Sequence, residues 1–305
     1  MVSAVSLEGV SKTYDDFHAV RDVSFEVPAG RITGFLGPNG AGKTSTIRMI
    51  LGLLPPSAGR ITVLGADDAT KVRERIGFLP EERGLYKRMT PIDAIAFFAG
   101  LKGVPEVEGR KRAKAMLEAQ GLGYAMKKPI KELSKGMAQK VQLISALAHE
   151  PELVVLDEPF SGLDPVNQQA LEAMIREIAA RGATVLFSTH VMQHAERLCD
   201  KVVLMARGRK VFDGDVATAR CAAPRALVLE GDLSAEQVMA LPGLGAVTSE
   251  ASPDGGWRHV AVLSETRGGH DALKAAFARD LSLRRFELKE PSLHDAFIVL
   301  TGGQA

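Results

Sequence analysis

The sequence contains a glycine-rich segment whose spacing suits the binding of a phosphate chain. Residues 37–44 read GPNGAGKT, fit the pattern G-x-x-x-x-G-K-[ST] and stand between a strand-like run and a helical run. Glycines let successive backbone N–H groups converge on phosphate oxygens, and the helix that follows presents the positive end of its dipole. Lys43 adds a point charge for the β- and γ-phosphates, and the Thr44 hydroxyl is placed for Mg²⁺. The predicted phosphate-binding residues are Gly37, Pro38, Asn39, Gly40, Ala41, Gly42, Lys43, Thr44 and Ser45.

Two adjacent carboxylates, Asp157 and Glu158, follow a short apolar strand in the segment LVVLDEP. The carboxyl end of a buried strand is where ligands bind in open parallel sheets. Asp157 is suited to hold Mg²⁺, directly or through water, and Glu158 is suited to accept a proton from the water that attacks a γ-phosphate. Taken alone, the pair fits a solvated strand end equally well, so its interpretation depends on the other motifs.

A second candidate anion site lies at Ser134 and Gly136, in the segment LSKGM that precedes the helical stretch AQKVQLISALAHE. A serine hydroxyl and the free N–H groups of a helix start can bind an anion together. The alternative is an ordinary serine N-cap that binds no ligand.

The elements that must position these residues alternate between strands and helices up to about Phe212, which predicts an α/β architecture. Short strands are expected at 3–10, 22–30, 31–37, 60–65 and 75–80, the first two in a small antiparallel sheet. From Thr90 the pattern becomes helical, with Pro91 at the first helical position, and we predict a mainly helical insert over about 81–150. The runs LVVLDE and ATVLFSTH are typical of buried parallel strands in the central sheet.

A second unit is expected after about Arg220. Strands are predicted at 226–230, 246–250, 258–263 and 282–288, helices at 234–241, 271–278 and 293–300, and a PDGG turn at 253–256. The order βαββαβ with an extra helix predicts a small α+β domain of the ferredoxin-like kind. We therefore expect two domains, a nucleotide-binding domain of residues 1–220 and an accessory domain of residues 221–305.

Composition narrows the class of protein. The chain has 305 residues, of which 46% are hydrophobic, enough for roughly two domains with a core each. A net charge of +1 gives no whole-chain field for a polyanion, so no nucleic-acid partner is expected. Cys199 and Cys221 stand apart, which fits a reducing compartment and excludes a four-thiolate zinc site. No apolar run approaches the roughly 20 residues that cross a bilayer, and Glu8 and Lys12 interrupt the start of the chain before a signal-peptide core could form. We expect a cytosolic protein without a transmembrane segment.

In their order along the chain, these motifs resemble those of the ATP-binding cassette (ABC) family of transporter ATPases. The phosphate loop, LSKGM, LDEP, SGLD at 161–164 and STH at 188–190 follow one another as in that family, within about residues 5–212. The resemblance implies a P-loop ABC fold with a mixed central sheet, a small antiparallel β part and a helical insert. It also implies that the chain binds and hydrolyses ATP with Mg²⁺.

The resemblance assigns roles to single residues. It implies that Tyr14 stacks on adenine, although a tyrosine packed in its strand is the alternative. The phosphate loop corresponds to Walker A, Asp157 to the magnesium residue of Walker B, and Glu158 to the catalytic base. Glu158, His190 and Lys43 are the expected catalytic residues, and Thr44, Asp157 and Glu81 the expected metal-site residues. His190 is expected to contact the γ-phosphate, and Asp164 to link two nucleotide sites.

In this family Ser134 and Gly136 belong to the signature segment, which closes on ATP bound by another cassette. A single chain would then be incomplete, and we expect a homodimer or a paired cassette that meets head to tail with ATP between its members. The resemblance further implies a separate membrane permease as partner and a peripheral location on the cytoplasmic face of the cell membrane.

Two positions depart from the usual family pattern. Glu81 stands where a glutamine usually follows the strand, and a carboxylate accepts hydrogen bonds but cannot donate them as an amide does. Lys135 stands where the signature usually has glycine, and it either touches phosphate or faces solvent. Both variants resemble the branch of sodium-extrusion and drug-export ATPases, which carry an extra domain after the cassette, so export is the expected direction of transport.

Two other functions stay open from the sequence. One is a soluble cassette ATPase of translation or DNA repair, although such proteins typically carry two cassettes or a long coiled coil. The other is a regulatory nucleotide-binding module with weak hydrolysis, which Glu81 and Lys135 would permit.

Three further groups have ordinary structural interpretations. His190 and His194 have the i, i+4 spacing of a zinc pair but lack the glutamate of H-E-x-x-H and a clear third ligand. The basic run Arg110, Lys111 and Arg112 with Lys114 is expected to be a solvated helix face, and a phosphate-binding or lipid-facing role is the alternative. Phe97, Phe98 and Leu101 are expected to be mostly core, with part of the insert forming a groove for a membrane partner.

Overall fold

The structure is a computed structural model that describes residues 2–82, 84–253, 255–264 and 268–303. It forms two compact units, residues 2–216 and residues 217–303. The predicted PDGG turn includes residue 254 and so lies partly outside the described residues. Among the helices described, none combines the length and the hydrophobicity that crossing a bilayer requires.

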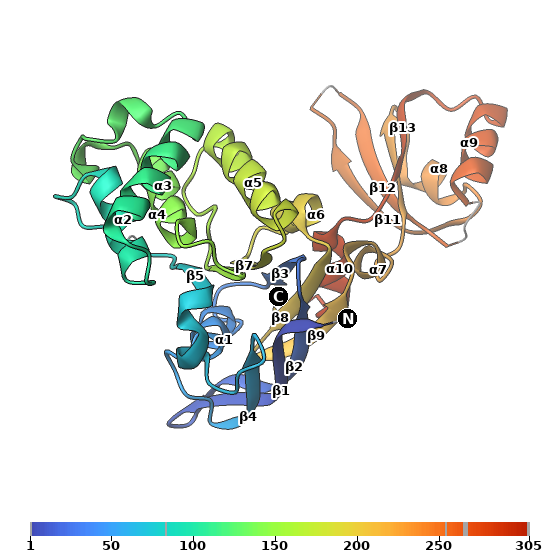
Figure 1. Cartoon of the computed structure of the whole chain (residues 1–305). Helices are drawn as coiled ribbons and strands as arrows, with labels where there is room; N and C mark the ends of the chain where they lie inside the picture. Colours follow the sequence, from blue (N-terminus) through green and yellow to red (C-terminus); the bar gives the residue numbers. More distant parts are fainter. Residues whose placement is uncertain (1, 83, 254, 265–267, 304–305) are drawn as a thin grey trace. The chain divides into compact units, whose positions relative to one another are not determined.

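A six-stranded sheet forms the centre of the first unit (Figure 1), with the order β5-β6-β7-β3-β8-β9. Neighbouring strands are parallel from β5 to β8, and β9 is antiparallel to β8, so the sheet is mixed as predicted. The strands are β3 (Ile32–Leu36), β5 (Ile76–Leu79), β6 (Leu153–Leu156), β7 (Thr184–Thr189), β8 (Lys201–Ala206) and β9 (Arg209–Gly214). All residues of β3, β6 and β7 are buried, which explains their apolar runs without alternation.

A second, antiparallel sheet has the order β2-β1-β4, formed by β1 (Ser3–Tyr14), β2 (Phe17–Pro28) and β4 (Ala58–Val63). Its inner face and the central sheet share one hydrophobic core with the helix α1 (Lys43–Ile50). Phe25 of β2 stacks on Phe35 of β3 with ring centroids 5.3 Å apart, and Ile47 of α1 is fully buried in the same core. This packing fixes α1 and the loop before it against both sheets.

The predicted helical insert contains α2 (Pro91–Gly100), α3 (Glu106–Ala119) and α4 (Lys135–Leu147), with short 3₁₀ turns at Gly123–Ala125 and Ile130–Glu132. Thr90 caps α2 and, as expected, Pro91 occupies its first turn. In Figure 1 the insert and the three-stranded sheet lie at opposite ends of the first unit. The unit is completed by η1 (Ala69–Arg75), α5 (Pro165–Ala180), α6 (Met192–Leu198) and the start of α7 (Val216–Arg220).

The prediction that the apolar side chains at the end of α2 are mostly core is wrong. Phe97 is 42% exposed and Leu101 is 64% exposed, and Phe98 is half-buried. The reason is the helical period, since the face of α2 that packs inward carries Ala94, Ile95 and Ala99.

The basic run of α3 is paired with carboxylates instead of only facing solvent. Arg110 lies 2.8 Å from Asp93 of α2, and Arg112 lies 3.3 Å from Glu150. Arg110 also pairs with Glu106 one turn earlier in the same helix. These ion pairs join α3 to its neighbours in the chain fold.

The second unit has a four-stranded antiparallel sheet with the order β11-β12-β10-β13. Its elements are β10 (Ala226–Gly231), α8 (Ala235–Met239), β11 (Leu244–Ala251), β12 (Trp257–Leu263), α9 (Gly268–Ala278), β13 (Leu283–Lys289) and α10 (Leu293–Leu300). This confirms the βαββαβ order with an extra helix, with helix bounds shifted by a few residues. Leu227, Leu229 and Ala261 form its core with Val238 of α8 and Ala272 of α9.

Candidate nucleotide site

The predicted phosphate loop connects β3 to α1, and its geometry requires glycine at two positions. At Gly37 a Cβ would lie 2.3 Å from the Met205 carbonyl oxygen of β8. Gly42 is the N-cap of α1 with a φ of 96°, in the left-handed region, and a Cβ there would lie 2.6 Å from the Ala19 carbonyl oxygen. Among the residues that the structure describes, no side chain caps α1 through a hydrogen bond. The N–H groups of its first turn are therefore free to bind an anion.

Lys43 turns its ammonium group back over this loop. The side chain is buried, and Nζ donates hydrogen bonds to the carbonyl oxygens of Gly37 at 2.7 Å and Pro38 at 3.1 Å. Nζ also lies 3.5 Å from Oε1 of Glu158, which follows β6. The structure thus brings the lysine of the loop and the second carboxylate of LVVLDEP into one ion pair.

Asp157 is buried at the carboxyl end of β6, where its Oδ1 accepts a 2.5 Å hydrogen bond from the Ser188 hydroxyl of β7. Burial raises the pKa of the Asp157 carboxyl, against the hydrogen bonds from Ser188 and Thr44. The Ser188 oxygen also accepts a hydrogen bond from the Glu158 N–H at 2.9 Å. Ser188 therefore links Asp157 to Glu158, although its place in the STH motif gave it no predicted role. The feature of the sequence that could have identified Ser188 is a polar residue at the end of an otherwise apolar strand.

Glu158 has a strained backbone, and its two carboxylate oxygens have different surroundings. Its φ of 46° is in the left-handed region, which costs a non-glycine residue roughly 1–3 kcal/mol. Oε2 lies 3.0 Å from Nδ1 of His190, whereas the buried Oε1 has no hydrogen-bond partner among the described residues. We call Lys43, Asp157, Glu158, Ser188 and His190 the phosphate cluster.

Ser134, Gly136 and Asp164 meet elsewhere in the first unit. Ser134 is the N-cap of α4, and Asp164 is the N-cap of α5, where its carboxylate accepts from the N–H of Asn167 at 3.0 Å and from its Nδ2 at 2.6 Å. These bonds lower the pKa of Asp164. The same Asn167 side chain lies against Gly136, where a Cβ would lie 2.6 Å from it.

We call Ser134, Gly136, Asp164 and Asn167 the cap cluster. Asn167 was missed by the sequence analysis, and its position three residues after a helix-capping aspartate was the only signal. In the part of the chain that the structure describes, no hydrogen bond or ion pair joins the cap cluster to the phosphate loop. Ser134 and Asp164 are both exposed.

Tyr14 ends β1 and is 42% exposed, so it is not packed in its strand. Lys12 lies over its ring, with Nζ 5.2 Å from the centroid. Tyr14 pairs with Phe17 across the turn to β2, two residues before Ala19, whose carbonyl oxygen abuts Gly42. The tyrosine is therefore on the hairpin that borders the phosphate loop, with its ring open to a ligand.

Glu81 is exposed in the segment after β5. Its side chain makes no hydrogen bond or ion pair within the described residues, so the structure does not join it to Thr44 or Asp157. His190 and His194 are not turned to a common metal either, because His190 faces Glu158 and His194 faces Glu172 of α5. Across the described residues, no group of three or more His, Cys, Asp or Glu side chains could hold a metal ion.

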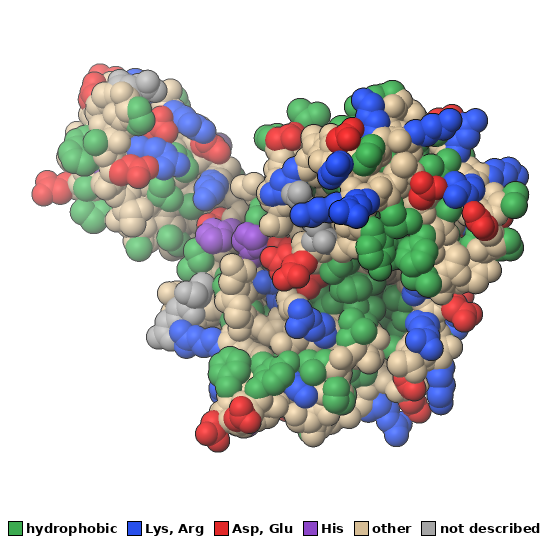
Figure 2. Space-filling model, turned by 90° about the vertical axis from the view of Figure 1, so that its left-hand side faces the viewer, with side chains coloured by type: hydrophobic (Ala, Val, Ile, Leu, Met, Phe, Trp, Pro, Cys, Tyr) green, Lys and Arg blue, Asp and Glu red, His purple; other side chains and the backbone are tan. Residues whose placement is uncertain are grey.

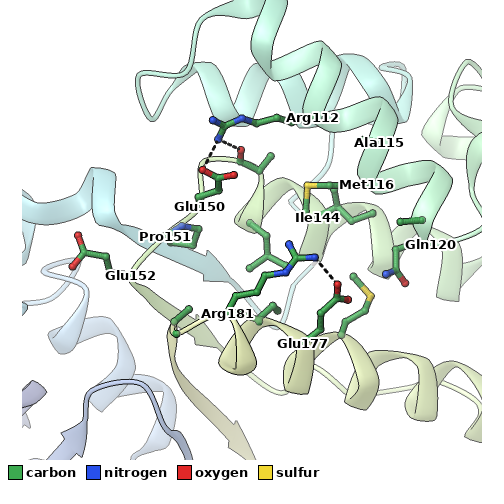
Figure 3. Close-up of a pocket in the computed structure, with 17 residues that line it drawn as sticks. Arg112, Ala115, Met116, Gln120, Ile144, Glu150, Pro151, Glu152, Glu177 and Arg181 are labelled. Atoms are coloured by element: carbon green, nitrogen blue, oxygen red, sulfur yellow. Dashed lines mark hydrogen bonds and ion pairs between the residues drawn. The ribbon is translucent and has the colours of Figure 1, made fainter.

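A cavity of about 540 Å³ lies away from both clusters, between α3, α4 and α5 (Figure 3). Met116, Ile144 and Met174 contribute to its apolar lining, and the ion pair of Arg181 with Glu177 lies at its edge. Pro151 and Glu152, which also line it, precede β6, so the cavity lies at the amino ends of the strands. The phosphate cluster lies at their carboxyl ends, and the cavity is no part of it.

Comparison with known proteins agrees with this geometry. The family model for ABC transporters matches residues 20–161. The chain is 37% identical over 302 residues to an uncharacterized ABC transporter ATP-binding protein, YhaQ, of Bacillus subtilis (strain 168), covering 98% of each chain. It is 33% identical over 308 residues to the Nod factor export ATP-binding protein I of Burkholderia lata, covering 99% of this chain and 98% of the relative.

A solved structure of the ATP-binding subunit of an ABC transporter matches with a TM-score of 0.66 and 34% identity, over 72% of this chain and 92% of that one. Neither relative is named as an ATPase of translation or DNA repair. The chain belongs to the ATP-binding proteins of ABC transporters, ATPases in which hydrolysis is coupled to transport.

Proposed function

We propose that ATP is bound by the phosphate loop and Tyr14 and hydrolysed at the phosphate cluster. The observation that supports this most directly is the continuous chain of contacts from Lys43 through Glu158 to His190, with separations of 3.5 Å and 3.0 Å. Lys43 supplies positive charge to the β- and γ-phosphates, and the free N–H groups at the start of α1 donate hydrogen bonds to their oxygens.

Glu158 is the general base in this proposal. Its carboxylate accepts the proton of the attacking water, and His190 holds Oε2 in place through Nδ1. The left-handed backbone at position 158 supports this role, since strain of this kind persists where the fold fixes a functional group.

Thr44 of the phosphate loop and Asp157 of the phosphate cluster together suit a magnesium ion. Thr44 and Asp157 offer a hydroxyl and a carboxylate, and oxygen donors are the ligands that Mg²⁺ prefers. Burial raises the pKa of Asp157, and Oε1 of Glu158 is buried without a hydrogen-bond partner among the described residues, so the cluster holds carboxylates that a cation would stabilise. When bound, Mg²⁺ would neutralise charge on the β- and γ-phosphate oxygens. Glu81 is the least supported of the three metal-site residues, because nothing in its contacts ties it to the other two.

The cap cluster acts on the nucleotide of a second cassette in a homodimer or a paired dimer. Ser134 and Asp164 are exposed at the starts of two helices and lack contacts to the phosphate loop of their own chain. Helix starts with a serine hydroxyl and free N–H groups bind anions, so this surface suits the γ-phosphate of a nucleotide held by another copy.

A membrane permease is the partner that couples hydrolysis to transport, and residues 1–220 and 221–305 serve as cassette and accessory domain. Tyr86, Phe97 and Phe98 form a cluster of rings with centroids 5.5 to 6.4 Å apart, and Leu101 continues it. Figure 2 shows hydrophobic side chains gathered in a hollow on the side of the molecule where α2 lies in Figure 1. An exposed apolar surface of this kind marks an interaction site. Docking there places the chain on the cytoplasmic face of the membrane.

Export is the direction we propose, because the relative of Burkholderia lata that matches nearly the whole chain is named as an export protein. The test is co-purification with a permease from native membranes, with the wild-type chain and a Phe97→Ser variant in parallel. We expect the wild-type chain to recover an integral membrane protein and the variant to lose it at unchanged ATP affinity. Recovery of the same protein by both chains would contradict docking through the ring cluster.

A further inference from the structure

A second group of buried charged side chains lies outside the phosphate cluster. Glu172 of α5 is 5% exposed and His194 of α6 is 3% exposed, with Oε1 of Glu172 3.0 Å from Nδ1 of His194. Arg197 of α6 donates to the same oxygen from Nη2 at 2.6 Å and from Nε at 3.1 Å. A carboxylate with two cationic or donor partners thus joins α5 to α6.

The protonation of this group follows from its donors and acceptors. An ionised carboxylate only accepts hydrogen bonds, so Nδ1 of His194 carries the proton that it shares with Glu172. The 3.2 Å approach of Arg197 to the same Nδ1 is then a contact and not a hydrogen bond. Burial alone would raise the pKa of Glu172, but the hydrogen bonds from Arg197 and His194 outweigh it and lower the pKa.

Such an arrangement is costly when its only role is to pack two helices. Buried ion pairs can often be replaced by apolar residues without loss of stability, because desolvation offsets their attraction. What an apolar pair would not provide is a fixed direction for the imidazole ring, which Glu172 sets through Nδ1.

The ring of His194 faces the segment that carries the catalytic carboxylate. It stacks on Phe160, with centroids 4.0 Å apart and planes inclined by 13°. Phe160 is buried two residues after Glu158, and its ring also contacts Phe187 of β7 edge-to-face, with centroids 5.9 Å apart. Phe187 is the residue before Ser188, and β7 leads to His190.

Three segments with proposed roles therefore meet at the His194 ring. The Glu158 segment contacts the ring through Phe160. The segment of His190 continues into α6, which carries His194 itself. Helix α5, which begins after Asp164, contacts the ring through Glu172. A turn of the ring would break its hydrogen bond to Glu172 and its stacking contact with Phe160.

We propose that His194 and Glu172 are positioning residues for ATP hydrolysis. They orient Phe160 and α6 so that Nδ1 of His190 stays within hydrogen-bond distance of Oε2 of Glu158. They touch neither the nucleotide nor the reacting atoms. The inference rests on the roles proposed above for Glu158 and His190.

The test compares Glu172→Gln, His194→Gln and His194→Ala in the full chain, with steady-state ATPase kinetics and equilibrium binding of ATP without Mg²⁺. We expect kcat to fall about tenfold or more in each, as removal of a group that orients a base does, with ATP affinity changed by less than about twofold. The matched control is Glu177→Gln, which alters an exposed ion pair of the same helix and should leave kcat unchanged. If kcat, ATP affinity and melting temperature all fall together in these variants, the role is merely structural and the proposal is overturned.

A second measurement uses His190→Ala. If His194 acts through His190, then adding His194→Gln to His190→Ala should lower the residual rate by less than about twofold, because the two changes remove one function. Full additivity of the two changes would overturn the proposal. This measurement uses His194→Gln, so it does not depend on whether His194→Ala folds.

Glu158→Gln separates this inference from the proposed function. If Glu158→Gln keeps the wild-type rate, the assigned base is wrong and the inference falls with it. If Glu158→Gln loses hydrolysis while Glu172→Gln and His194→Gln keep the wild-type kcat, only the positioning role is wrong.

Discussion

The phosphate cluster and the cap cluster belong to the same unit but differ in burial and in the source of their partners. Lys43, Asp157, Glu158 and Ser188 are buried and bond to one another across strands that are far apart in the sequence. In the cap cluster the exposed helix caps mainly bond groups within three residues of themselves. One cluster is preorganised inside a single chain, whereas the other is an exposed surface for which we propose a ligand held by another copy.

The strongest test of the phosphate cluster is Glu158→Gln, which removes the proton acceptor and keeps the shape of the side chain. We expect kcat for ATP to fall by a factor of about 10²–10⁴, the usual contribution of a general base. ATP should still bind, and the variant should accumulate as a closed dimer, measured by size-exclusion chromatography with ATP. A wild-type rate would contradict the role of the buried cluster.

The cap cluster can be tested by mixing two inactive variants, Lys43→Ala and Ser134→Arg. If each cap cluster serves the nucleotide of the other copy, a mixed dimer has one intact site, because the loop of one variant meets the cap of the other. An equal mixture should then recover about one quarter of the wild-type ATPase rate, since half of the dimers are mixed and each has one of two sites.

Each variant alone is the control and should stay inactive. If the cap cluster served its own chain, both sites of a mixed dimer would be broken, and mixing would recover no activity.

A smaller effect is expected for stability. Because burial raises the pKa of Asp157, the folded state holds its proton more tightly than the unfolded chain does. This stabilisation is present at acidic pH, below the ordinary range of a carboxyl group, and is lost as the pH rises through the raised pKa. At neutral pH, Asp157→Asn should therefore increase the free energy of unfolding by about 1 kcal/mol while it abolishes hydrolysis.

Chemical denaturation of both chains at pH 4 and pH 7 would measure this difference. The gain should shrink at the lower pH, and a gain that grows there would show that the carboxylate is stabilised by its surroundings.

The smallest change is expected for Asp164→Asn. Asparagine also caps helices, but the bonds that lower the pKa of Asp164 stabilise its charged form in the folded state, so the melting temperature at neutral pH should fall slightly as the charge is lost. We expect ATP turnover to fall by less than about tenfold, which is of the order of a single exposed electrostatic contact. An unchanged melting temperature would show that the hydrogen bonds to Asn167 do not depend on the charge of the carboxylate.

The contrast between the clusters also explains what the sequence could predict. Continuous motifs such as residues 37–44 specify local backbone and appear in order, so the loop and the βαββαβ order of the second unit are confirmed. Contacts between distant segments leave no such pattern. The bridge of Ser188 between Asp157 and Glu158, and the contact of Asn167 with Gly136, depend on strand order and helix packing that no spacing encodes.

The wrong prediction for the end of α2 has a related cause. Hydrophobic residues there follow one another so closely that the period alone does not say which face packs inward. Phe97 and Leu101 are exposed because Ala94, Ile95 and Ala99 provide the inward face, where the two alanines let α2 approach its neighbours closely. The large side chains are left on the outside, where a partner can use them.

The positive φ at Glu158 restricts which amino acids that position can accept, whatever their chemistry. Valine, isoleucine and threonine have side chains that branch at the β carbon, and these clash most with such a backbone. Glycine would adopt this backbone conformation without strain, and asparagine with little strain. In a library of all replacements at position 158, the stability of the folded chain should therefore depend mainly on how well each residue tolerates a positive φ. The glycine variant should be inactive and yet rank among the most stable.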